Sequence, residues 1–168
     1  MRTRLALLAL MFATAAAVSQ LPAQAPAKQE KQPKATKTYS SAADITAMMA
    51  KAKNERKADQ ANFSQTILQL APYGANMEYR SAVPQAAAVH EKEAEMFYVI
   101  DGSGTLVTGG KLVGETRNGD NLTGTAIEGG NTQNVGKGDF FIVPEKTPHW
   151  FSKINGTLVL MSLHVPRS

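Results

Sequence analysis

The strongest constraint on the fold is a succession of short strand-like segments that follows Asn62. Gly, Pro and Asn residues separate these segments and favour turns between them. Regularly spaced short strands with turn signals predict an all-β antiparallel barrel or sandwich. No Gly-rich phosphate loop followed by a helical pattern occurs, so nucleotide-binding α/β folds are disfavoured. The predicted strands are 64–71, 75–81, 86–90, 96–100, 105–108, 123–128, 132–135, 140–143, 149–152 and 158–164.

Residues 109–130 are rich in Gly and Asn and contain the dipeptide Asn118-Gly119. Asn-Gly is a strong signal for a two-residue β-hairpin loop. A surface loop is the competing interpretation of this stretch.

One helix is predicted before the strands. Ser41 and Asp44 have the spacing of a capping box, and apolar residues that include Met48 and Met49 recur at helical spacing over 42–57. The two methionines suit either a ligand-binding face or packing of the helix against a sheet, and we expect packing.

Residues 1–27 resemble a secretory signal peptide with its cleavage region. Arg2 and Arg4 precede an apolar stretch that is shorter than the ~20 residues of a membrane-spanning helix, although an uncleaved anchor is the alternative. Cleavage after Ser19 or after Ala27 fits the preference for small residues. We therefore expect a periplasmic or secreted protein without a membrane span after cleavage.

The N-terminal segment also accounts for much of the chain's basic character. Arg2 and Arg4 make up half of the formal net charge of +4. Residues 28–40 are rich in Lys, Ala, Gln and Pro and predict a disordered linker. Because the lysine-rich residues 28–38 have no interleaved aromatic residues, we expect no nucleic-acid partner. The predicted organisation is a signal region (1–27), a linker (28–40), a helical segment (41–61) and a β domain (62–168).

The chain of 168 residues contains no cysteine and only three histidines. The lack of cysteine excludes disulfides, thiolate catalysis and Cys-ligated metals. His90 is followed by Glu95 and Gly102, and His149 follows Gly138 and Pro144. A short hairpin that brings an imidazole and a carboxylate to one cavity suits a divalent metal ion.

These two patterns resemble the motifs of the cupin superfamily. The first motif, G-x5-H-x-H-x(3,4)-E-x6-G, is matched by His90, Glu95 and Gly102. The second, G-x5-P-x-G-x2-H-x3-N, is matched by Gly138, Pro144 and His149, and the two occur in the expected order. The resemblance implies a single cupin β-barrel.

The chain also departs from the cupin motifs. Ala88 stands where the first motif has its first histidine, and the opening glycine of that motif is absent. Lys146 replaces the glycine of the second motif, and Lys153 replaces its terminal asparagine.

The resemblance implies that His90, Glu95 and His149 ligate a divalent metal ion such as Mn, Fe, Zn or Ni. The competing interpretation is that the two histidines only line a pocket and that Glu95 is a surface acid. His164 is expected to be structural or exposed. Glu91 and Glu93 are expected in a solvated turn, although either can substitute for the missing ligand.

Two functions remain open. The first is a metal-dependent cupin enzyme that acts on a small organic substrate by oxygenase, isomerase or lyase chemistry, with Glu93 or Tyr98 as a candidate acid or base. The second is a non-catalytic module that binds a small ligand or metal. Cupin-like barrels often pair through their sheets, so a homodimer is a further expectation.

Overall fold

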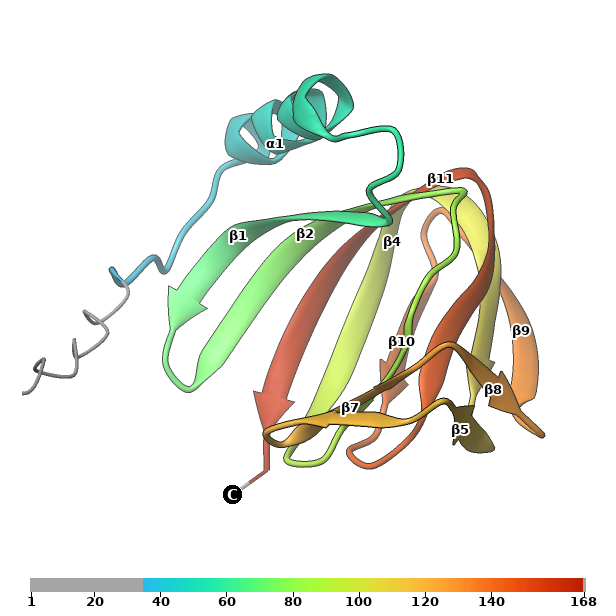
Figure 1. Cartoon of the computed structure of the whole chain (residues 1–168). Helices are drawn as coiled ribbons and strands as arrows, with labels where there is room; N and C mark the ends of the chain where they lie inside the picture. The colour runs from blue at the N-terminus through green and yellow to red at the C-terminus, as the bar shows by residue number, and fades with distance from the viewer. Residues whose placement is uncertain (1–34, 168) are drawn as a thin grey trace, which may run out of the picture. The chain divides into compact units, whose positions relative to one another are not determined.

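The computed structural model describes residues 35–167. The predicted signal region and most of the predicted linker lie outside these described residues. The described part contains one helix and eleven strands (Figure 1). These elements are α1 (Ala42–Glu55), β1 (Asn62–Leu70), β2 (Tyr73–Ser81), β3 (Ala87–His90), β4 (Glu93–Thr108), β5 (Lys111–Val113), β6 (Thr116–Asn118), β7 (Asn121–Gly124), β8 (Ala126–Glu128), β9 (Asn131–Gly136), β10 (Phe140–Val143) and β11 (His149–Pro166).

The strands form an antiparallel barrel around two long strands, β4 and β11. The main sheet has the order β1-β2-β11-β3-β7-β6. Strand β4 pairs with β11 of this sheet and also with β9 and β10. Strands β5 and β8 form a separate two-stranded sheet. The predicted all-β fold with one leading helix is confirmed.

Two pairs of predicted strands are each one continuous strand. Segments 96–100 and 105–108 both lie in β4, and segments 149–152 and 158–164 both lie in β11. Gly102 explains the continuity on β4, because it has a φ of 81° and a Cβ added there would lie 2.0 Å from the backbone oxygen of Thr157. This glycine lets β4 change direction while it stays packed on β11, whereas the sequence pattern suggested a break.

The predicted hairpin at Asn118-Gly119 is present with its loop shifted by one residue. Asn118 ends β6 and pairs with Asn121 at the start of β7, so Gly119-Asp120 form the two-residue loop. Gly119 has a φ of 62°, a conformation that glycine adopts without steric cost. The predicted strand 123–128 is divided between β7 and β8.

The helix α1 packs on the outer strands β1 and β2. Its predicted capping box is present, with Ser41 and Asp44 each accepting a hydrogen bond from the other's backbone N–H. Met48 and Met49 join an apolar cluster with β1 and β2, and the Gln65 side chain donates a 2.7 Å hydrogen bond to the carbonyl of Met48. The expectation that these methionines pack against the sheet is confirmed, and the helix ends two residues before the predicted position.

Residues 35–40, at the end of the predicted linker (28–40), lie against strand β1 at Lys37. The backbone N–H of Lys37 donates to the carbonyl of Gln69 at 2.8 Å, and the N–H of Gln69 returns a bond of 2.7 Å. The edge strand β1 offers unpaired backbone groups, and these hold the extended chain at Lys37. Within residues 35–167, no helix is long and apolar enough to cross a membrane.

An apolar core lies inside the barrel, next to the predicted metal ligand His149. Its buried residues include Phe97, Val99, Leu106, Phe151 and Leu160 from β4 and β11. The ring of Phe97 lies 6.2 Å from the ring of His149, centroid to centroid. The core therefore packs behind His149, one of the predicted metal ligands.

Candidate metal centre

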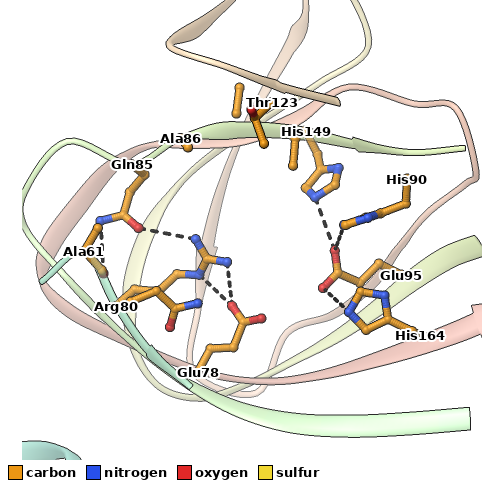
Figure 2. A pocket seen from close by; sticks show the side chains of 13 residues that line it. Ala61, Glu78, Arg80, Gln85, Ala86, His90, Glu95, Thr123, His149 and His164 are labelled. Atoms are coloured by element: carbon orange, nitrogen blue, oxygen red, sulfur yellow. Dashed lines mark hydrogen bonds and ion pairs between the residues drawn. The ribbon is translucent and has the colours of Figure 1, made fainter. Parts of the chain in front are cut away.

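Glu95 is the centre of the polar cluster that Figure 2 shows. This glutamate is 4% exposed, and all three histidines of the described chain point their Nε2 atoms at its carboxylate (Figure 2). His90 Nε2 and His149 Nε2 lie 3.3 Å and 3.2 Å from Glu95 Oε2. His164 Nε2 lies 3.4 Å from Glu95 Oε1. Two nitrogens therefore approach one carboxylate oxygen and a third approaches the other.

Three strands bring these four residues together. His90 is the last residue of β3, Glu95 lies in β4, and His149 is the first residue of β11. His164 lies near the other end of β11, where it pairs with Glu95 across the sheet. Each end of β11 thus contributes one imidazole to the same cluster.

Each imidazole is held by an oxygen at its other ring nitrogen. His90 Nδ1 lies 2.8 Å from the side-chain oxygen of Asn121, and His164 Nδ1 lies 2.8 Å from Glu93 Oε1. His149 Nδ1 lies 3.3 Å from the carbonyl oxygen of Thr147. An oxygen acceptor at Nδ1 selects the neutral tautomer that carries its proton there. An Nε2 atom that carries a proton donates it to the Glu95 carboxylate, and an Nε2 atom without one presents its lone pair to the same place.

The electrostatics of Glu95 suit a metal ligand. Burial by itself would raise the pKa of this carboxyl, but its hydrogen bonds with His149 and His90 hold the pKa well below its usual range. Burial also lowers the pKa of His90, and the hydrogen bonds to Glu95 and Asn121 outweigh this effect and leave the pKa raised. Glu95 is therefore an ionised carboxylate among imidazoles, and the cluster attracts positive charge.

The donor set fits a divalent metal ion. The candidate ligand atoms of His90, Glu95 and His164 all lie within 4.8 Å of one another, whereas the predicted ligand His149 is outside this group and approaches Glu95 alone at 3.2 Å. Imidazole nitrogens and a carboxylate oxygen are ligands shared by Zn, Fe, Mn and Ni sites. The oxygen held at each Nδ1 matches the outer partners that orient histidine ligands in metal sites.

The cluster lines a pocket of about 320 Å³. His90, Glu95, His149 and His164 all contribute to its wall, together with Ala88. Ala88 is the position at which the cupin motif has a histidine. Alanine supplies no imidazole at this position. His164 approaches Glu95 from another strand, β11.

His164, which was expected to be structural or exposed, lies in the pocket beside Glu95. The side chain is 24% exposed, lines the pocket and forms ion-pair contacts with Glu93 and Glu95. No spacing within either motif signals His164, because the antiparallel pairing of β11 with β4 brings it beside Glu95. Knowledge of that strand register would have identified it.

The other acidic and aromatic candidates have separate positions. Glu93 holds His164 and does not lie in a solvated turn, whereas Glu91 forms an ion pair with Arg117 at 2.7 Å on the surface. Tyr98 is 40% exposed and is not among the residues that line the pocket. Trp150 is partly buried and donates a 2.9 Å hydrogen bond to the carbonyl of Gln85, which supports a packing role.

Comparisons with known proteins give similarity in structure only. No family model matches the chain, and no curated protein matches it in sequence. A structure of KdgF from Halomonas sp. aligns at a TM-score of 0.48 and 15% identity, over 67% of this chain and 87% of that chain. The cupin domain of Cnp3 from Schizosaccharomyces pombe aligns at 0.46 and 13%, over 67% and 70%. A conserved protein with a double-stranded β-helix domain from Klebsiella pneumoniae aligns at 0.46 and 14%, over 66% and 82%.

The placement of the two motifs agrees with the strand pairing. The first motif spans β3 and β4, the second spans β10 and β11, and their His and Glu residues converge on one pocket. The fold itself is an antiparallel β-barrel with one leading helix. Lys146 stands in place of the motif glycine and has a φ of 60°, a conformation that favours glycine. Its N–H donates a 2.7 Å hydrogen bond to the carbonyl of His90.

Proposed function

We propose that this protein is a cupin and binds one divalent metal ion through His90, Glu95, His149 and His164. The convergence of three Nε2 atoms on one buried carboxylate supports this proposal most strongly. With a proton on each Nδ1, these nitrogens and the carboxylate oxygens are all acceptors. A cation between them satisfies all four groups. In this proposal His164 is the fourth ligand and takes the place of the histidine that the motif has at Ala88.

The proposed metal chemistry is directed at a small organic substrate. A bound divalent ion polarises a substrate oxygen or lowers the pKa of a bound water, which serves oxygenase, isomerase or lyase reactions. The pocket of about 320 Å³ gives a small molecule access to the four ligands. In this site Asn121, Thr147 and Glu93 keep the imidazoles oriented toward the ion.

Metal content of purified variants tests the proposal. The protein is stripped with a chelator, reloaded separately with Mn, Fe, Ni or Zn, dialysed and analysed by plasma mass spectrometry. We expect near one ion per wild-type chain and a large loss in His90→Ala, His149→Ala and His164→Ala, with the fold of each checked by circular dichroism. Glu91→Gln is the control, because Glu91 lies beside the motif but pairs with Arg117 at the surface.

Two results would contradict the four-ligand assignment. Folded wild-type protein that takes up none of the four metals would contradict metal binding altogether. Full metal content in His164→Ala would remove His164 from the ligand set. Loaded protein that binds small molecules without converting any of them would favour the binding module over the enzyme.

We also propose that the chain is exported, on the basis of residues 1–27. Expression in a Gram-negative host with its full N-terminus should give a mature protein that begins after Ser19 or after Ala27. Intact-mass analysis of periplasmic and cytoplasmic fractions measures this. A full-length chain in the cytoplasm would contradict export, and a full-length chain in the membrane fraction would indicate an uncleaved anchor.

A further inference from the structure

The pocket has a second polar group opposite the metal cluster. Figure 2 shows Arg80, Glu78 and Gln85 on one side of the pocket and the histidines on the other. Arg80 and Glu78 both lie in β2, and Arg80 Nε donates a 2.7 Å hydrogen bond to Glu78 Oε2. Arg80 Nη1 donates a longer bond of 3.3 Å to the Gln85 side-chain oxygen. The proposed metal centre does not use any of these three residues.

The guanidinium of Arg80 keeps hydrogen-bonding capacity on the pocket side. Arginine has five N–H donors. Within residues 35–167, its partners are Glu78, through Nε and Nη2, and Gln85, through Nη1. Each terminal nitrogen therefore keeps one N–H. The Arg80 side chain is 16% exposed and lines the pocket, so a ligand can reach these donors.

The surroundings hold the guanidinium in place. Its carbon lies 5.0 Å from the centroid of the Phe151 ring, and Glu78 also accepts a 3.0 Å hydrogen bond from the Ser162 hydroxyl. Glu78 is 7% exposed, so the ion pair is largely withdrawn from water. Such a pair contributes little net stability, because desolvation offsets the attraction. A preorganised donor facing a cavity is well suited to recognise a planar anion.

The charge of the loaded pocket points to an anion of low charge. Among the residues that line the pocket, the carboxylates of Glu78 and Glu95 and the guanidinium of Arg80 leave one net negative charge, and imidazoles that ligate a metal ion add none. A divalent ion changes this to one net positive charge. A monocarboxylate neutralises the pocket, whereas a phosphate monoester brings close to two negative charges and exceeds it.

We propose that the substrate is a small hydroxy or oxo monocarboxylate whose carboxylate pairs with Arg80 while its oxygen function reaches the metal. This assignment rests on the proposed metal site. A cavity of about 320 Å³ has room for about ten non-hydrogen atoms, at roughly 30 Å³ for each water-sized unit of liquid. Glu78 and Gln85 position Arg80 through their hydrogen bonds.

Calorimetric titration of the zinc-loaded wild-type protein tests the first half of the proposal. The probes are 3-hydroxypropionate, 4-hydroxybutyrate and 6-hydroxyhexanoate, each compared with its neutral amide. We expect at least one acid to bind about tenfold or more tightly than its amide, the effect of one charged hydrogen-bonded contact. Equal binding of each acid and its amide, or binding of none of the acids, would overturn the proposal.

The double variant Arg80→Gln/Glu78→Gln tests the second half. Changing both residues avoids leaving a buried glutamate unpaired. We expect the preference for the acid to disappear while zinc content stays at the wild-type level, and Arg167→Gln, which removes a surface arginine, to keep the preference. An unchanged preference in the folded double variant would overturn the role of Arg80. Arg80→Lys keeps the charge without the planar fork, and it should lose about half to nine-tenths of the affinity and none of the zinc.

Zinc measurement on the same samples separates the two proposals. Wild-type protein without zinc would overturn the metal site, and with it the substrate assignment. Wild-type protein with full zinc but without acid preference would overturn the substrate assignment alone.

Discussion

Glu93 is the residue whose role in the site is most open to a direct test. Its carboxylate touches His164 Nδ1 at 2.8 Å and leaves His164 Nε2 directed at Glu95. It therefore positions a ligand without itself belonging to the proposed ligand set. Partners of this kind typically contribute 10- to 100-fold to metal affinity.

Replacement of Glu93 should weaken metal binding according to hydrogen-bonding capacity. We expect Glu93→Ala to lower zinc affinity about 10- to 100-fold, because His164 loses the acceptor that selects its tautomer. Glu93→Gln should retain most of the affinity, because its amide oxygen can accept the same hydrogen bond. Competition with a chromophoric chelator measures both, and equal affinities of the two variants would contradict the positioning role.

Residue spacing predicted three members of the cluster. The motif intervals pointed to His90, Glu95 and His149, because a hairpin between β3 and β4 and a turn before β11 fix local distances along the chain. The place of His164 in the cluster was not predicted, since it depends on the pairing of β11 with β4 over a long sequence separation. Arg80 and Glu78 carried no motif signal and are recognised only by their place in the pocket.

At the scale of the elements, β4 depends on a glycine at its bend. Gly102 combines a φ of 81° with close contact to the backbone of Thr157. A side chain at this position is strained by its own conformation and also collides with β11. The sequence pattern predicted a strand break here, because glycine is common in turns. For β11, too, the sequence pattern predicted two strands where the structure has one continuous strand.

The substitution Gly102→Ala should destabilise the fold. We expect the free energy of unfolding to fall by about 1–3 kcal/mol, the usual cost of a strained backbone position, with further loss from the contact with β11. Gly136→Ala is the matched control in β9, because Gly136 has no positive φ and an added Cβ would approach only Ser103 Cβ, at 4.0 Å. Urea unfolding followed by circular dichroism measures both, and equal effects of the two substitutions would contradict this explanation.

At the scale of the whole molecule, the proposed metal ion would connect strands that are distant in sequence. Its ligands come from β3, β4 and both ends of β11, and a ligand that binds only the folded chain stabilises it by mass action. The sequence predicted the all-β barrel and its leading helix, because turn residues and apolar alternation are local signals. The path of residues 35–40 along β1 was not predicted, since it depends on an edge strand formed elsewhere.

Removal of the metal should therefore lower thermal stability. With free ion at a hundred times its dissociation constant, the loaded protein should be more stable by about 2.7 kcal/mol, which corresponds to several degrees in Tm. Calorimetry before and after chelation, followed by reloading, measures the change and its reversal. His164→Ala should show a smaller shift than wild type at the same ion concentration, and an unchanged Tm in stripped wild-type protein would contradict the connection.

The two histidines of β11 have a consequence for the motion of that strand. His149 and His164 occupy opposite ends of one continuous strand, yet both contact Glu95, so β11 must arch back on itself around Gly156, which has a φ of 79°. An ion bound to both imidazoles would close residues 149–164 into a ring. Fraying from either end would then require a coordination bond to break first. Amide hydrogen exchange along this arch should slow as a unit when the ion binds, including at residues far from any ligand.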